Sequence, residues 1–164
     1  MKTQTNITEI NHEDLVNLFS TAFYGSNYLS VEYDDSQIED SEDDCHEDSI
    51  AKVLLAGGTI RVTDHYAEGS VYGNLPHDML TDEDEEGNVV YYVTLEDIKT
   101  GLAKAINGNF NTGENDSFSP DWVERQLSFA HRSFFAFAYD DREWDLVTAD
   151  CLMQIILFNE IIYG

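Results

Sequence analysis

The sequence predicts an α+β fold, in which helices pack on a small antiparallel sheet. Two observations predict it: apolar residues at helical spacing alternate along the chain with short β-branched segments, and 42% of the 164 residues are hydrophobic, including nine Tyr and nine Phe. That content supplies a core of ordinary size for one domain. The chain shows no internal repeat and no dividing linker, so residues 1–164 are expected to form a single acidic domain.

Capping residues mark where the helices are expected to begin. Asn11 can cap a helix that starts at His12, and Thr94 can cap one in which Asp97 is the third residue. Gly25 and the pair Gly57-Gly58 provide helix ends. The patterns predict helices over 12–24, 49–56, 95–107, 120–134 and 147–158, while 134–139 fits either the end of a helix or a buried strand.

Three segments are typical of strands. Residues 28–33 form a short β-prone segment with Tyr28, Leu29, Val31 and Tyr33. Residues 59–64 alternate apolar and polar side chains, and 89–93 is the clearest strand in the chain. Between the last two, Tyr66–Pro76 is rich in Gly, Asn and Pro, which predicts a loop or a loose hairpin arm.

Charge is the feature that most limits the possible functions. Against 33 acidic residues stand eight Lys and Arg, giving a formal net charge of -25. Such a field repels DNA and anionic membranes, so neither is an expected partner. The polar N-terminus, the lack of a run of about 18 apolar residues and the separate Cys45 and Cys151 favour a reduced, cytoplasmic protein.

The acids are concentrated in three clusters, which are the candidate partner-binding residues. Ten lie within 32–48, six within 78–86, and a third group falls within 140–145. Acids near a helix start are favourable, which accounts for only the last two of the first cluster. The expected contact residues are Glu32, Asp34, Asp35, Glu39, Asp40, Glu42, Asp43, Asp44, Glu47, Asp48, Asp82, Glu83, Asp84, Glu85, Glu86, Asp140 and Asp141.

Metal and catalytic motifs are weak. Asp82-x-Asp84-x-Glu86-Gly87 resembles the start of a calcium loop, but position 12 is Val93 and a strand follows, so an acidic hairpin turn is the better interpretation. Cys and His residues lack zinc spacing, and no nucleophile or phosphate-loop motif is present. We therefore expect no cofactor, no metal site and no enzymatic activity.

The C-terminal segment resembles a group of small acidic proteins encoded by bacteriophages and prophages. Residues 149–164, ADCLMQIILFNEIIYG, match that group's Gln-containing helix and closing segment, with Asn159 where glycine is usual. The turn at Gly57-Gly58-Thr59 and the segment 93–97 are also similar. The resemblance implies a phage or mobile-element origin and a compact α+β domain.

In charge, though not in sequence, the chain resembles DNA-mimicking anti-CRISPR and anti-restriction proteins. We expect its partner to be a basic DNA-binding protein of the bacterial host, a CRISPR effector first and a restriction nuclease second. Two alternatives remain open: a phage accessory or structural domain whose acids serve only solubility, and a calcium-dependent module. The sequence leaves the oligomeric state open.

Overall fold

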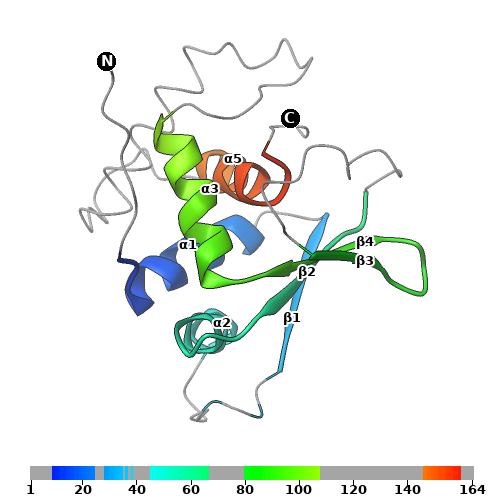
Figure 1. Cartoon of the computed structure of the whole chain (residues 1–164), viewed down its shortest axis with the longest axis horizontal. Coiled ribbons are helices and arrows are strands. Elements are labelled where there is room, and N and C mark those ends of the chain that lie inside the picture. The colour runs from blue at the N-terminus through cyan, green and yellow to red at the C-terminus, as the bar shows by residue number, and fades with distance from the viewer. Residues whose placement is uncertain are drawn as a thin grey trace.

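The computed structural model describes residues 9–24, 28–34, 36, 38, 45–66, 80–107 and 146–159. Within them the chain forms four helices and a four-stranded antiparallel sheet, which confirms the α+β prediction (Figure 1). In chain order the elements are α1 (His12–Tyr24), β1 (Leu29–Tyr33), α2 (His46–Leu55), β2 (Ile60–Asp64), β3 (Leu80–Glu83), β4 (Val89–Val93), α3 (Leu95–Asn107) and α5 (Leu146–Phe158).

The strand order is β1-β2-β4-β3, and every neighbouring pair is antiparallel. Val62 of β2 lies opposite both Val31 and Tyr91, which sets the register of the three strands. Side chains on one face of the sheet join the core beneath the helices, whereas Ser30, Glu32 and Arg61 are exposed. The core residues of the sheet are Leu29, Ile60, Val62, Val89, Tyr91 and Val93.

Helix α5 lies at the centre of the helical layer. All its residues from Cys151 to Phe158 are buried, and both α1 and α3 pack against it. Gly101 is what allows α3 to approach, because a Cβ there would lie 2.6 Å from the Cα of Ile156. A strongly apolar helix with few charges is the expected occupant of such a position.

The predicted caps are present. The Asn11 side chain accepts the N–H of Asp14 at 2.8 Å, and the Asp14 carboxylate accepts the N–H of Asn11 at 3.0 Å. Thr94 and Asp97 form the same reciprocal arrangement at the start of α3. Each pair satisfies backbone donors that a helix start leaves without partners.

Left-handed residues end two of the helices. Gly57, after α2, has φ +84°, and a Cβ on the next residue, Gly58, would come within 2.8 Å of the Val53 carbonyl oxygen. Asn159, after α5, has φ +55°. Glycine and asparagine tolerate this conformation best, so both residues suit the helix ends at which they occur.

Two features differ from the sequence prediction by more than one residue. Helix α2 begins at His46 rather than Ser49, and its capping position is Cys45, a residue type that seldom caps helices. Strand β3 was not expected, because acidic residues have low strand propensity; pairing with β4 determines its conformation. The helix predicted over 120–134, the open segment 134–139 and most of the loop 66–76 lie outside the described residues.

Candidate binding surface

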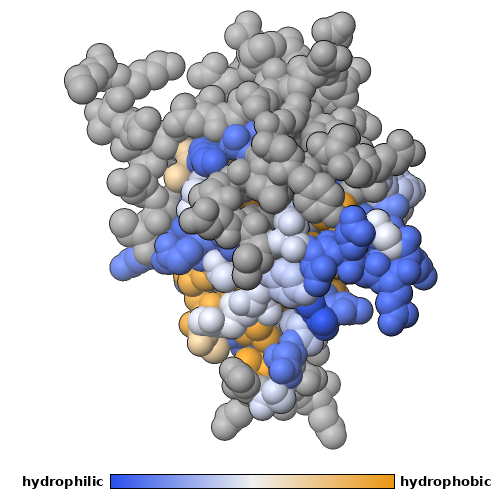
Figure 2. Space-filling view, turned by 45° about the vertical axis from the view of Figure 1, so that its right-hand side comes forward, coloured by the Kyte–Doolittle hydropathy of each residue, from blue (hydrophilic) through white to orange (hydrophobic). Residues whose placement is uncertain are grey.

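The described part of the second acidic cluster, Asp82–Glu86, forms the end of β3 and the turn into β4, an acidic hairpin turn as the sequence favoured. Asp82 and Glu83 end β3, while Glu85 and Glu86 lie in the turn, and all four side chains are exposed. Hydrophilic residues gather on the side of the molecule where this hairpin projects (Figure 2). The hairpin therefore presents four carboxylates to solvent from an ordered backbone.

Asp84 differs from its neighbours because it builds the turn. One carboxylate oxygen accepts the N–H groups of Glu86 at 3.0 Å and Asn88 at 2.8 Å, and the other accepts the Asn88 amide at 3.0 Å. Hydrogen bonds from the Asn88 side chain and backbone hold the pKa of Asp84 below its ordinary value. Gly87 completes the turn with φ +83°.

A calcium loop of the EF-hand type is inconsistent with this geometry. In that motif a helix follows the loop and supplies a bidentate glutamate. Here Gly87 leads into strand β4, and position 12 is Val93. Among the described residues, no group of three or more His, Cys, Asp or Glu side chains is arranged to hold a metal ion.

The first acidic cluster is described only at its two ends. Glu32 lies opposite Arg61 on the exposed face of the sheet, and their side chains form an ion pair at 3.1 Å. Asp34 is exposed, and hydrogen bonds from Ser36 lower its pKa. Eight of the predicted contact residues lie outside the described residues: Asp35, Glu39, Asp40, Glu42, Asp43, Asp44, Asp140 and Asp141.

At the far end of that cluster, Asp48 acts within the fold. Its carboxylate accepts the N–H of Cys45 at 3.2 Å, which completes the start of α2, and lies 3.4 Å from His12 at the start of α1. It also accepts the Cys45 thiol at 2.9 Å, and this hydrogen bond raises the pKa of Cys45. Asp48 therefore links two helix starts and keeps the exposed thiol protonated, which lowers its nucleophilicity.

The two clusters leave the sheet at opposite ends. Tyr33, where β1 enters the first cluster, is level with Ile60 and Val93, whereas Glu83, beside the hairpin turn, is level with Val89 and Asp64. A five-residue strand spans about 13 Å. Asp34, next to Tyr33, and the hairpin acids thus lie near opposite ends of one sheet, roughly the axial length of four base-pair steps of DNA apart.

Sequence reasoning missed a polar network beside the hairpin end of the sheet. The Tyr28 hydroxyl donates to Asp150 of α5, and the buried Gln154 side chain donates to the other Asp150 oxygen at 2.7 Å. Burial raises the pKa of Asp150 although both hydrogen bonds oppose the shift. The only signal in the sequence was the occurrence of Asp150 and Gln154 four residues apart on an otherwise apolar helix.

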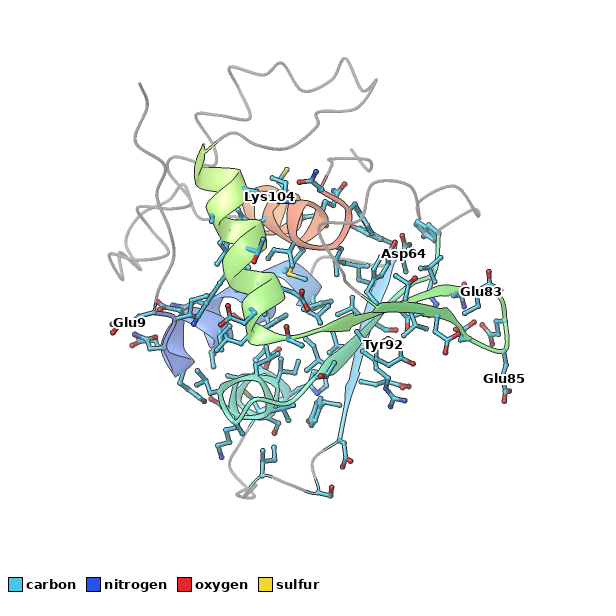
Figure 3. All side chains as sticks on the ribbon, in the orientation of Figure 1. Glu9, Asp64, Glu83, Glu85, Tyr92 and Lys104 are labelled. Atoms are coloured by element: carbon cyan, nitrogen blue, oxygen red, sulfur yellow. The ribbon has the colours of Figure 1, made fainter. Side chains whose placement is uncertain are left out.

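Tyr66 continues this network to the surface. Its ring stacks on Tyr28, with centroids 6.0 Å apart, and its N–H donates to Asp64 at 2.9 Å. Asp64 is fully buried at the end of β2, on the side of the molecule that carries Glu83 and Glu85 (Figure 3).

No protein-family model, curated protein or solved structure shows significant similarity to the chain. None of the described helices combines the length and apolar character that crossing a membrane requires.

Proposed function

We propose that this protein is a DNA mimic, an inhibitor that occupies the basic DNA-binding groove of a host-defence nuclease. A CRISPR effector is the first candidate target and a restriction nuclease the second. The observation that carries the proposal is a net charge of -25 on an ordered α+β fold whose hairpin presents exposed carboxylates in fixed positions. Carboxylates held on a rigid frame compete with phosphates for Lys and Arg side chains.

The arrangement of the acids supports mimicry over solubility alone. A solubility function requires only that charges be spread over the surface. Here 16 of the 33 acids lie in two runs of the sequence, and the described part of the second run projects from one end of the sheet as the hairpin, where like charges repel one another unless a basic surface meets them. Complementary charge also speeds encounter between the partners.

Displacement of DNA tests the proposal directly. Labelled duplex DNA bound to a purified CRISPR effector or restriction nuclease should be released as the protein is added, in a gel-shift assay. The effect should weaken steeply with salt, since exposed charges are screened over about 10 Å at 0.1 M. Failure to release DNA from any nuclease, or affinity unchanged between low and high salt, contradicts mimicry.

A matched pair of double variants tests whether the hairpin acids are responsible for DNA displacement. Glu85→Gln with Glu86→Gln removes two hairpin charges, whereas Glu9→Gln with Glu13→Gln removes two exposed charges near the start of α1. Glu9 and Glu85 lie on opposite sides of the molecule (Figure 3). The hairpin pair should weaken displacement more than the control pair; equal effects indicate a response to net charge only.

A further inference from the structure

Tyr66 is one of two large apolar side chains that are well exposed among the described residues. It is 55% exposed, and Leu55, at the end of α2, is 42% exposed. Aromatic residues that combine exposure with a fixed orientation are typical anchors in protein interfaces. The two side chains differ in what supports them, and this difference distinguishes Tyr66.

A chain of contacts fixes the Tyr66 ring from the core outward. Gln154, fully buried in α5, binds Asp150; Asp150 binds the Tyr28 hydroxyl; and the Tyr28 ring stacks against Tyr66 at an interplanar angle of 23°. From the other side, the buried Asp64 accepts the Tyr66 N–H. A side chain ordered before binding loses little conformational freedom when a partner arrives.

The same end of the sheet carries the acidic hairpin. Asp64 pairs with Val89, and Val89 pairs with Glu83, so the residues after β2 are level with the hairpin turn. His65, the next residue after Asp64, donates its N–H to the Tyr28 carbonyl oxygen at 2.8 Å, so the chain stays at this end of the sheet up to Tyr66. An exposed aromatic ring and exposed carboxylates therefore lie at the same end of one sheet.

We propose that Tyr66 and the hairpin acids Asp82–Glu86 form an arginine-binding surface, in which the ring stacks on a guanidinium group while the carboxylates attract its charge. A guanidinium is planar and weakly hydrated and stacks on aromatic rings, whereas a lysine ammonium is compact and strongly hydrated. The partner is thus a basic protein surface in which arginine is the contact residue. The inference rests on the proposed function and specifies its contact end and partner chemistry.

Two fluorescent peptides, ten arginines and ten lysines long, test this preference by fluorescence anisotropy at fixed ionic strength. The unmodified protein should bind the arginine peptide more tightly. Tyr66→Ala should weaken arginine-peptide binding about three-fold, the order of one exposed cation–π contact, and change lysine-peptide binding much less. Tyr66→Phe, which retains the ring, should keep the preference.

Leu55→Ala is the matched control, because it removes the other exposed apolar side chain, and it should leave binding of both peptides unchanged. The double variant Glu85→Gln with Glu86→Gln should weaken the binding of both peptides to a similar extent. Equal binding of both peptides by the unmodified protein, or a Tyr66→Ala variant that keeps the full preference, overturns the inference. Arginine preference without DNA displacement from any nuclease would instead contradict the proposed function and leave this surface standing.

Discussion

The Tyr28 hydroxyl donates a hydrogen bond to the carboxylate of Asp150, 122 residues further along the chain. Tyr28 immediately precedes β1, and Asp150 lies on α5, so this contact joins the end of the sheet to the central helix. Gln154 fixes the same carboxylate from within α5. A single phenolic group thereby contributes to the attachment of two distant segments.

Removing that hydroxyl should destabilise the fold. We expect Tyr28→Phe to lower the free energy of unfolding by about 1–2 kcal/mol, because a partly buried carboxylate loses a donor. Urea denaturation followed by circular dichroism measures the change. Tyr66→Phe removes a hydroxyl from a ring that is more than half exposed and should cost much less; equal losses for the two variants would show that the Asp150 contact contributes nothing.

Asp150 should also shape the pH dependence of stability. Burial raises its pKa above the ordinary value of 3.8, so between 3.8 and the raised value the folded protein retains a proton that the unfolded chain has released. The contribution to stability is therefore present below pH 3.8 and is lost as pH rises through the folded pKa. Asp14, whose pKa is raised by burial near the start of α1, contributes with the same sign.

The variant Asp150→Asn isolates the contribution of this carboxyl group to the pH dependence of stability. The decline in unfolding free energy as pH rises above about 4 should become shallower, measured by urea denaturation across a pH series. Glu85→Gln removes one exposed charge and serves as the control, since the overall repulsion of 33 acids changes with pH in the same direction. If both variants flatten the profile equally, net charge rather than the buried group sets the slope.

Gly101→Ala should reverse the usual effect of this substitution in a helix. Alanine normally stabilises a helix interior by about 1 kcal/mol relative to glycine. Here the new methyl group would lie 2.6 Å from the Cα of Ile156, so we expect a loss of about 1–3 kcal/mol as α3 and α5 are forced apart. The midpoint temperature of thermal unfolding measures this loss of stability.

Gly87→Ala provides a comparison by a different mechanism. A Cβ there meets nothing within 4 Å, and its φ of +83° should cost about 1 kcal/mol of backbone strain. A stabilised Gly101→Ala protein would contradict the close contact between the two helices.

Local chemistry accounts for what the sequence predicted well. Asn11 and Thr94 cap helices through contacts within three residues; alternation with β-branching identified β2, and the run of Val and Tyr after Gly87-Asn88 identified β4. Strand β3 escaped prediction because the chain acquires that conformation from β4, not from its own residues. The start of α2 escaped because a cysteine occupies the capping position and Asp48 supplies the reciprocal bond.

The candidate site also has a part that the sequence predicts and a part that it does not. Exposed hairpin acids are visible in the sequence, because a run of carboxylates before Gly87-Asn88 predicts a turn at the surface. The contacts that support the Tyr66 ring are not visible in the sequence, because Tyr28 and Asp150 meet only through the tertiary fold. That Asp48 bridges two helix starts was equally inaccessible, since His12 lies 36 positions before it.

The strand order β1-β2-β4-β3 places β1 and β3 at the outside of the described sheet, and each carries carboxylates: Glu32 on β1, Asp82 and Glu83 on β3. An outer strand offers backbone hydrogen-bonding groups on which a second copy can extend the sheet, and charged side chains are a common defence against such pairing. Two copies that approach edge to edge would bring like charges together. The acids at these edges therefore oppose sheet-to-sheet aggregation even when the protein is concentrated.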